Sequence, residues 1–536
     1  MLVFVPMAGF GERYRRAGHA QPKPLIPVDG RPMIDRVIGD LSPLRPGDRW
    51  LFAINRAHAE TTSLRDELLR AAPGAAVVVV DPHRDGPVAT LLAVADHVAP
   101  DEAVLLNYCD FGARWSLPDF LAWCERGAWD AAMSAYRGFH PHSLGPTLYA
   151  YMRTEEDAST APGARVLEVR EKHHFTDDRR GEYASAGLYW FRHGATLLEA
   201  ARAVVAAGER AAGEFYVSTA VQRLVVAGMR VGAYPLERFF QWGTAEDLAD
   251  WESWARAMRD VDRFTAAIAR TFSTSVQVIP MAGRGDRFAR AGFATPKPLI
   301  PVAGAPMIAQ ALGFLPTPSR RVLVVRSEHT RDAAFTACVR ALPGETAVVT
   351  LDAVTDGQAT SAHVGAALVE PEAPLLIAPC DAGHLYAPKA LVALEHDARC
   401  DLAVWSASDY LPARWRPEMY GWLTANGERR VTALAVKELV PGVEAARQEV
   451  LTGAFWFRSR ALYDEAYAAL RASGERVNGE LYIDAMARWA VRRGLDVRAF
   501  AVERFISWGT PDELSTFDYW NAVFRGGRAL GAEPAP

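Results

Sequence analysis

Cysteine is scarce in this chain, which has only five among 536 residues. No two of them form a Cys-x-x-Cys motif, so we expect neither a disulfide framework nor a zinc knuckle. No stretch reaches the roughly 18 apolar residues of a membrane span. The opening MLVFVPMAGFGERY has too short an apolar run for a signal peptide. The sequence therefore predicts a reduced, cytoplasmic protein without a membrane partner.

A strong charge of either sign is also missing. The formal net charge is −5, and the basic residues are spread along the chain rather than clustered. Nucleic acid is therefore not an expected partner, and an anionic ligand would have to be bound by a local site. Hydrophobic residues make up 50% of the chain and charged residues 23%. This is typical of a folded protein, here long enough for two or more domains.

The chain does contain a long internal repeat. Residues 6–28 read PMAGFGERYRRAGHAQPKPLIPV, and residues 280–302 read PMAGRGDRFARAGFATPKPLIPV. The two copies begin 274 positions apart. Solenoid repeats span only roughly 20 to 50 residues, so the repeated unit here is a whole domain. Shorter matches follow in the same order in both halves, namely DGPVAT and DGQATS, two Cys-Asp pairs, GEFY and GELY, and QWGT and SWGT.

The repeat predicts a first domain at residues 1–271 and a second at residues 272–536, joined near the segment TFSTS. Residues 244–270 are rich in Ala, Glu, Arg and Trp, and we expect a helix there that closes the first domain. The tail at residues 526–536 is rich in Gly, Ala and Pro and is expected to be frayed.

Short apolar runs alternate with helical patterns in each half. This alternation predicts an α/β fold whose sheet is mainly parallel, with helices on both faces. In such sheets ligands bind beyond the carboxyl ends of the strands, where the first glycine loop and Asp110 would both lie. In the first half the expected strands are residues 2–6, 50–55, 76–80 and 104–107, and the expected helices are residues 32–41, 59–71 and 89–98.

Each half begins with a glycine-rich loop. Its two glycines allow a tight turn that brings backbone N–H groups close to phosphate oxygens, and the following arginine can clamp a polyphosphate. The motif alone is weak, and it is not the dinucleotide fingerprint, because the third glycine is missing. The residues expected to contact a phosphate ligand here, which the resemblance given below identifies as a nucleotide, are Ala8, Gly9, Gly11, Arg13, Ala282, Gly283, Gly285 and Arg287.

A lysine between two prolines follows each loop. Proline fixes its own φ and restricts its neighbour, so Lys23 and Lys297 are expected on a stiff, extended segment. A surface lysine is the plain alternative, but recurrence of the whole segment favours a phosphate contact. Asp110 and Asp381 each follow a strand-like run. A carboxylate there suits Mg²⁺ held together with substrate phosphates, and capping of the next turn is the alternative.

Other shared residues are less specific. Lys172 and Lys437 follow strand-like segments, and most lysines are simply solvated. Glu214 and Glu480 lie in Gly-Glu-x-Tyr segments and could bind a polyol or begin a helix. The cysteine before each metal-site aspartate is interpreted as a small buried residue rather than a nucleophile.

These motifs resemble those of the sugar-phosphate nucleotidylyltransferases, or NDP-sugar pyrophosphorylases. The resemblance covers most of each half, and its long loop is similar to that of a branch associated with capsule and lipopolysaccharide precursors. It implies two tandem Rossmann-like domains, each with a mixed, mainly parallel sheet. It also implies transfer of a nucleotidyl group from an NTP to a sugar 1-phosphate, with release of pyrophosphate. It rests in the first half on Gly-Phe-Gly-Glu-Arg at 9–13, Pro-Lys-Pro at 22–24, Asp110, Glu-Lys at 171–172, Gly-Leu-Tyr at 187–189 and Gly-Thr at 243–244.

The resemblance also implies roles for single residues. The loop arginines would hold the NTP phosphates, Lys23 and Lys297 would stabilise charge around the α-phosphate, and Asp110 and Asp381 would bind Mg²⁺. Such transfer needs alignment and charge neutralisation more than covalent catalysis. Further nucleotide contacts are expected at Gly86, Gly357 and Gln358, and acceptor contacts at Lys172, Gly187, Glu214, Lys437, Gly453 and Glu480.

One position departs from the family. Many members carry a second metal-binding aspartate two residues before the late Gly-Thr, where this chain has Gln241 and Ser507. Either substrate oxygens and water complete the coordination of the ion, or another acid substitutes. Asp247 and Asp512 are close in sequence, but each is expected to begin a helix instead.

We favour two active centres, because both halves keep the loop, both lysines and the aspartate. The halves differ at positions expected to face the nucleotide, such as Pro87 against Gln358, so their substrates could differ. One alternative makes one half a nucleotide-sensing or interface module. Another is a nucleotide-sugar glycosyltransferase, which would require an Asp-x-Asp motif that neither metal-site aspartate belongs to. A monomer and a homodimer both stay open.

Overall fold

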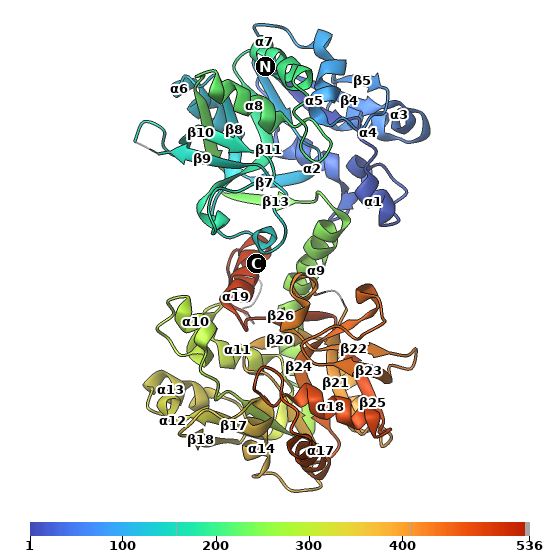
Figure 1. The fold of residues 1–536 in the computed structure, drawn as a ribbon, viewed down its shortest axis with the longest axis vertical. Coiled ribbons are helices and arrows are strands. Elements are labelled where there is room, and N and C mark those ends of the chain that lie inside the picture. Colours follow the sequence, from blue (N-terminus) through green and yellow to red (C-terminus); the bar gives the residue numbers. More distant parts are fainter. Residues whose placement is uncertain (157, 409, 531–536) are drawn as a thin grey trace. The chain divides into compact units, whose positions relative to one another are not determined.

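The computed structural model describes residues 1–156, 158–408 and 410–530, which form two compact units (Figure 1). The first unit is Met1–Glu252, and the second begins at Ser253. The division falls within helix α9 (Ala245–Ile268), the helix expected at 244–270. The domain bounds 1–271 and 272–536, which were predicted from the repeat, stay a prediction. Residues 531–536 of the tail expected to fray lie outside the described residues.

A mixed sheet forms the centre of the first unit. Its strands, in sheet order, are β5 (Ala76–Val80), β4 (Arg49–Asn55), β1 (Leu2–Met7), β6 (Val104–Asn107), β11 (Tyr183–Phe191), β8 (Ala131–Tyr136), β12 (Val231–Pro235), β10 (Ala164–Arg170) and β9 (Tyr151–Glu155). β5, β4, β1 and β6 are parallel to one another, whereas β11 is antiparallel to β6 and β8. The four strands expected from the sequence are therefore present, as consecutive members of the parallel part.

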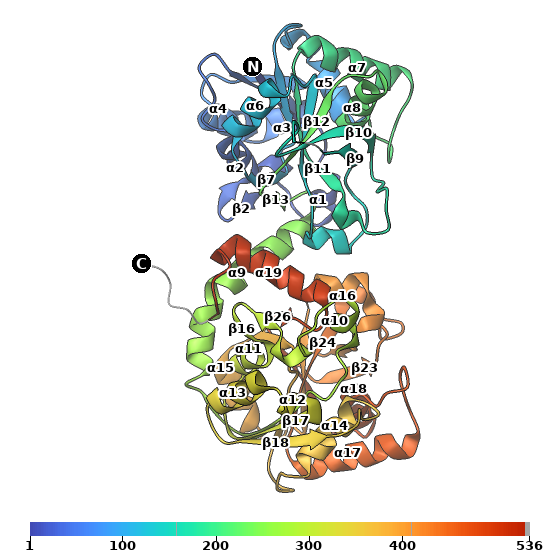
Figure 2. The same cartoon turned by 90° about the vertical axis from the view of Figure 1, so that its left-hand side faces the viewer.

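Helices cover both faces of this sheet, as the alternation predicted. Leu2 and Phe4 of β1 belong to one apolar cluster, and Val3 and Val5 belong to the other, since successive side chains of a strand point to opposite faces. In Figure 2, α5, α7 and α8 lie on one side and α2, α4 and α6 on the other. The helices of this unit are α1 (Glu12–Arg16), α2 (Met33–Asp40), α3 (Arg56–Thr61), α4 (Leu64–Ala71), α5 (Pro87–Ala93), α6 (Leu117–Arg126), α7 (Gly194–Ala206) and α8 (Val217–Val226).

Two expected helices differ in extent from those observed. The helix expected at 59–71 is divided into α3 and α4, because Thr62 is extended and Ser63 begins a new helix. The helix expected at 89–98 ends as α5 at Ala93, and a short 3₁₀ turn (Ala95–His97) follows. The first break falls in the polar run at residues 60–63, whereas apolar residues continue past the second break to Val98, so the apolar pattern did not mark the second one.

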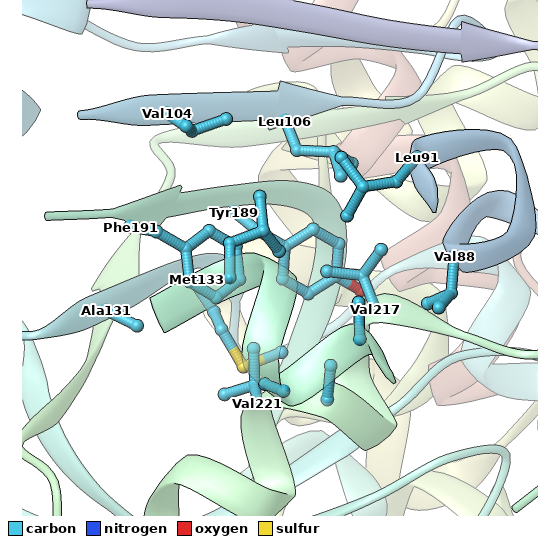
Figure 3. Close-up of a cluster of buried hydrophobic side chains, with 14 of the residues drawn as sticks. Val88, Leu91, Val104, Leu106, Ala131, Met133, Tyr189, Phe191, Val217 and Val221 are labelled. Carbon is cyan, nitrogen blue, oxygen red and sulfur yellow. The ribbon is translucent and has the colours of Figure 1, made fainter. Parts of the chain in front are cut away.

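The core on the α5 and α8 face holds together the two strands that carry the site loops (Figure 3). Val104 and Leu106 of β6 and Tyr189 of β11 pack there with Val88 and Val217 from the covering helices, and all are buried. Burial of one such side chain contributes about 1.5–3 kcal/mol. The cluster therefore fixes β6 beside β11 and supports the loops that leave their ends.

The second unit repeats this sheet in the same order, β18-β17-β14-β19-β24-β21-β25, with β22 paired to both β23 and β24. The strands are β14 (Phe272–Pro280), β17 (Thr317–Arg326), β18 (Thr346–Leu351), β19 (Leu375–Ile377), β21 (Leu402–Ala407), β22 (Trp422–Ala425), β23 (Val431–Ala435), β24 (Glu449–Phe457) and β25 (Val497–Ala501). The helices are α10 (Asp286–Arg290), α11 (Met307–Gly313), α12 (Ser327–Thr330), α13 (Ala333–Ala341), α14 (Gln358–Ala366), α15 (Pro388–Glu395), α16 (Leu411–Trp415), α17 (Arg460–Ser473), α18 (Ile483–Arg492) and α19 (Pro511–Arg525). Among the described residues, no helix is both long and apolar enough to cross a bilayer.

A short ladder outside each main sheet joins two segments that lie far apart in sequence. In the first unit β7 (Phe111–Arg114) pairs antiparallel with β13 (Arg238–Gln241). In the second, β20 (Ala382–Leu385) pairs with β26 (Arg504–Ser507). The first strand of each ladder follows the predicted metal-site aspartate, and the second precedes Trp-Gly-Thr, so the ladder brings these two motifs together.

Candidate active sites

The glycine loop of each half turns directly after the first strand of its sheet. Gly11 and Gly285 lie in the left-handed region, at φ 63° and 69°, which glycine adopts without steric cost. The turn passes close over the Pro-Lys-Pro segment. A Cβ at Gly11 would lie 3.5 Å from Cβ of Lys23, and one at Gly285 would lie 3.3 Å from Cβ of Lys297. The loop and the predicted lysine thus form one continuous surface.

The lysine of each Pro-Lys-Pro segment forms an ion pair with the aspartate predicted to bind metal. Nζ of Lys23 lies 2.5 Å from Oδ2 of Asp110, and Nζ of Lys297 lies 2.5 Å from Oδ2 of Asp381. The four side chains keep between 18% and 29% of their exposure. Each pair is therefore largely buried, yet still accessible to a ligand.

The lysine ammonium also contacts the late Trp-Gly-Thr segment. Nζ of Lys23 donates to the carbonyl of Gly243 at 2.9 Å. The segment is held there because the N–H of Trp242 donates to the carbonyl of Asp110 at 2.9 Å. The second half repeats the two contacts, at 3.2 Å and 2.8 Å, with Lys297, Gly509, Trp508 and Asp381.

The Asp-Gly loop before α5 or α14 packs against the Gly-Glu-x-Tyr segment of the same half. A Cβ at Gly86 would lie 2.8 Å from the carbonyl oxygen of Phe215, and one at Gly357 would lie 2.4 Å from that of Leu481. Both distances are too short for a real Cβ, so glycine is required where the two segments meet. The predicted glutamate of each half is thereby placed beside the predicted nucleotide loop.

The lysine predicted to bind the acceptor has the same rare backbone conformation in both halves. Lys172 and Lys437 have φ of 55° and 59°, which is uncommon for a residue with a Cβ, and such strain concentrates at functional sites. Nζ of Lys172 donates to Oη of Tyr216 at 2.8 Å, whereas Nζ of Lys437 donates to the carbonyl of Met419. Desolvation lowers the pKa of Lys437, and the charge of Asp484 opposes this effect.

Each half contains a cavity, of about 720 Å³ in the first half and about 260 Å³ in the second. Of the predicted residues, the first cavity is lined by Ala8, Gly9, Gly11, Arg13, Lys23, Gly86, Asp110 and Glu214. The second is lined by Ala282, Gly283, Gly285, Lys297, Gly357, Gln358, Asp381 and Glu480. Five predicted residues lie outside these linings, namely Lys172, Gly187, Arg287, Lys437 and Gly453.

The two cavities differ beside the Asp-Gly loop. His83 and Arg84 line the first cavity, and Val354 and Thr355 line the second at the same places in the repeat. Nδ1 of His83 accepts the N–H of the residue two positions later at 3.2 Å, and Nε2 lies 3.0 Å from Oγ1 of Thr90. The imidazole is therefore held in place, and the two halves offer different chemical surroundings to a nucleotide.

A second carboxylate approaches each lysine–aspartate pair, and of the two acids considered for this place from the sequence only Asp247 is one of them. It comes from the first turn of the helix after Trp-Gly-Thr, from Asp247 in α9 and Glu513 in α19. In the second half the acid facing Gly509 is Glu513 rather than Asp512, the acid considered from the sequence. One signal was available, since both halves carry an acid three residues after the threonine of Trp-Gly-Thr.

Burial and neighbouring charges shift several protonation equilibria at the two sites. Desolvation acts to lower the pKa of Lys297, but Asp381 and other anionic groups outweigh it, and the net shift is upward. The lysine is thus a cation at neutral pH. Desolvation raises the pKa of Asp247 to about 6. It also raises the pKa of Cys109 and Cys380 to about 12, which argues against a nucleophilic role for either thiol.

The donor set of each half suits a hard divalent cation. A Cβ at Gly509 would lie 3.2 Å from Oδ2 of Asp381 and 3.2 Å from Oε2 of Glu513, so glycine leaves room between two carboxylates. The lysine ammonium beside them already stands in for a cation. Among the described residues, no group of three or more His, Cys, Asp or Glu side chains could hold a metal ion. Mg²⁺ would therefore take water as further ligands, and phosphate oxygens of the substrate once it is bound, as it typically does.

Comparison with known proteins gives the family. The MobA-like NTP transferase domain matches residues 3–174 and 277–473. The chain belongs to the MobA-like NTP transferase family. Because two separate segments match, the tandem repeat predicted from the sequence is confirmed, and so is the predicted nucleotidyltransferase activity class. A search of curated proteins finds no match to this MobA-like NTP transferase.

Solved structures of single-domain length resemble this MobA-like NTP transferase. The nucleoside-diphosphate-sugar pyrophosphorylase from Vibrio cholerae RC9 is 19% identical, with 47% of this chain and 99% of that chain covered and a TM-score of 0.39. The inositol-1-phosphate CTP transferase from T. maritima is 17% identical, with 47% and 98% covered and a TM-score of 0.36. A UDP-glucose pyrophosphorylase complexed with UDP-glucose is 14% identical, with 47% and 96% covered and a TM-score of 0.37.

Proposed function

We propose that each half transfers the nucleotidyl group of an NTP to a sugar 1-phosphate or a related phosphorylated acceptor. The observation that carries this proposal is the lysine–aspartate pair that lines one cavity with the glycine loop, in both halves. A cation beside backbone N–H groups is what a polyphosphate requires. The product would be a nucleotide-activated sugar of the kind used for capsule, lipopolysaccharide or other glycan precursors.

The reaction needs no protein nucleophile. An oxygen of the acceptor phosphate, which is already ionised at neutral pH, forms a bond to the α-phosphorus. The bond from that phosphorus to the bridging oxygen breaks, and pyrophosphate leaves with the electron pair. Lys23 or Lys297 stabilises the charge that spreads over the α-phosphate oxygens, while the loop N–H groups with Arg13 or Arg287 hold the rest of the triphosphate.

Mg²⁺ is the cofactor that the carboxylates favour. Asp110 and Asp381 would hold it, and the bound ion would supply positive charge to the phosphate oxygens. Lys172 and Lys437, with Glu214 and Glu480 as polar partners, are the side chains proposed to hold the acceptor.

The two halves are proposed to have different substrate preferences. His83 and Arg84 give the first cavity a polar and cationic surface where the second has Val354 and Thr355. An alternative makes the second half a nucleotide-binding module without turnover. Its support is that Arg287, unlike Arg13 of the first half, lies outside the lining of its cavity, which is also the smaller of the two.

A product assay tests the proposed function. The protein is incubated with Mg²⁺, each of the four NTPs labelled at the α-phosphate, and a panel of sugar 1-phosphates and phosphorylated non-sugar alcohols. We expect at least one pair to release pyrophosphate and to transfer the label to the acceptor in equal amounts. Absence of pyrophosphate with every pair, together with consumption of nucleotide sugars, would support the glycosyltransferase alternative instead.

A further inference from the structure

Two carboxylates and an ammonium group meet around one glycine in each half. A Cβ at Gly243 would lie 3.6 Å from Oδ2 of Asp247 and 3.7 Å from Oδ2 of Asp110, and the equivalent distances at Gly509 are both 3.2 Å. The lysine ammonium of each half donates to the carbonyl of the same glycine. Two carboxylates and the lysine ammonium therefore lie close to one glycine in each half.

In the second half, the carboxylate of Glu513 is oriented by two phenols. Oη of Tyr410 and Oη of Tyr420 each donate to Oε1 at 2.8 Å, while Oε2 faces Gly509. One oxygen is thus fixed by the protein, and the other is directed at the glycine. Ser507, which occupies the position of the missing family aspartate, accepts the N–H of Gly509 at 3.2 Å.

In the first half, the shorter side chain of Asp247 lies at the equivalent place and is oriented by the amide of Gln241. Oδ1 of Asp247 accepts from Nε2 of Gln241 at 2.6 Å, and Oε1 of Gln241 accepts in turn from the phenol of Tyr149. Oδ2 of Asp247 faces Gly243. A tyrosine therefore supports the acid in both halves, directly for the longer glutamate and through glutamine for the shorter aspartate.

Helix capping alone does not explain these acids. Oδ2 of Asp247 accepts the N–H of Thr244 at 3.0 Å, as expected in a capping box. In the second half the Glu513 carboxylate is held by phenols, although Thr510 caps the helix through its own hydroxyl. What the halves share is the approach of one carboxylate oxygen, Oδ2 of Asp247 or Oε2 of Glu513, to the glycine beside the lysine–aspartate pair.

From this geometry, and resting on the proposed function, we propose that Asp247 and Glu513 are the second carboxylates of the two cation sites. Each acts with the aspartate of its own half, Asp110 or Asp381. The lysine ammonium is the resting occupant, and it moves to the α-phosphate when the metal–nucleotide complex binds. The same carboxylate position is then formed by two interchangeable residue pairs. The first half uses Gln241 with Asp247, and the second half uses Ser507 with Glu513.

Binding of Mn²⁺, followed by electron paramagnetic resonance without nucleotide, tests this assignment independently of turnover. The background is Lys23→Ala/Lys297→Ala, in which neither site contains its own ammonium. We expect two Mn²⁺ ions per chain, and addition of Asp247→Asn or Glu513→Gln should weaken one of the two by about tenfold or more. The neighbouring acids provide matched controls, and Glu246→Gln and Asp512→Asn should leave both affinities unchanged. Unchanged Mn²⁺ affinity in the Asp247 and Glu513 variants would overturn the assignment.

Exchange of the two residue pairs between the halves gives a second test, again read out by Mn²⁺ binding. Acids with a purely structural role would not give the expected results. Asp247→Glu alone should weaken Mn²⁺ binding, because the longer acid is crowded by Gln241, and Gln241→Ser/Asp247→Glu should restore it. The reverse exchange, Ser507→Gln/Glu513→Asp, should restore what Glu513→Asp loses. Failure of both double variants to recover affinity, with unchanged thermal unfolding, would contradict the proposal. If Mn²⁺ binding behaves as expected but no NTP is turned over, the cation sites stand and the proposed function fails.

Discussion

Lys23→Ala is expected to remove the activity of the first half and leave that of the second, and Lys297→Ala is expected to do the reverse. Each ammonium contacts an aspartate and a backbone carbonyl beside the glycine loop, and from there it is proposed to move to the α-phosphate of a bound NTP. Loss of one preorganised group that stabilises transition-state charge typically costs about 10²–10³ in kcat. Pyrophosphate release, measured with the preferred NTP and acceptor of each half, reports the loss.

Two further variants make this result decisive. Lys389→Ala removes an exposed lysine of α15 and should behave as the wild type. Lys23→Ala/Lys297→Ala should lose both activities. If either single variant abolishes all turnover, the other half is a binding module. If the double variant stays active, the lysines do not have the proposed role.

The second large effect is expected from Asp110→Asn and Asp381→Asn. Asparagine keeps the size of the side chain but removes the charge that pairs with the lysine at 2.5 Å. We expect kcat of the affected half to fall by about 10² or more, and the Mg²⁺ concentration at half-maximal rate to rise. Kinetic titration with Mg²⁺ at saturating NTP and acceptor measures both quantities.

A matched control comes from the same half. Asp101 is exposed in the turn before β6, and Asp101→Asn should change neither kcat nor the Mg²⁺ requirement. Wild-type kcat and Mg²⁺ dependence in Asp110→Asn or Asp381→Asn would show that the carboxylate is needed only as a partner of the lysine in the resting protein. The cation site would then have to be sought elsewhere.

The fold and the first set of site residues were predictable because their signals are local and repeated. Apolar runs located β1, β4, β5 and β6 in the parallel part of the sheet. Gly11 and Lys23 were recognisable because a tight turn and a proline-flanked lysine have few other uses, and because both recur in the second half. The hydrogen bond from Lys23 to the carbonyl of Gly243 was not predictable in this way, because the two residues are 220 positions apart. Their contact depends on strand pairing that no local pattern encodes.

The second carboxylate was harder to predict, because its position depends on helix phase and side-chain length. Asp512 and Glu513 are adjacent, and only the observed start of α19 decides which one faces Gly509. In the first half the direction of Asp247 depends on its hydrogen bond to Gln241. The sequence marked that position as a departure from the family, without showing that glutamine still serves the site by orienting another acid.

Identical motifs also hid a difference between the halves. Arg13 and Arg287 occupy the same position of the loop, yet only Arg13 lines the cavity of its half. The residues that differ beside the Asp-Gly loop, such as His83 and Val354, lie in the region where a nucleotide would be distinguished. Shared motifs therefore predict shared chemistry, whereas substrate preference depends on the positions that diverged.

The central claim, that one chain carries two nucleotide sites, is tested most directly by binding stoichiometry. Calorimetric titration with Mg²⁺ and α,β-methylene analogues of the four NTPs counts sites without turnover. We predict two sites per chain over the set of nucleotides, with one lost in Lys23→Ala and the other in Lys297→Ala. A single site in the wild type, abolished by one of these variants and unaffected by the other, would contradict the claim.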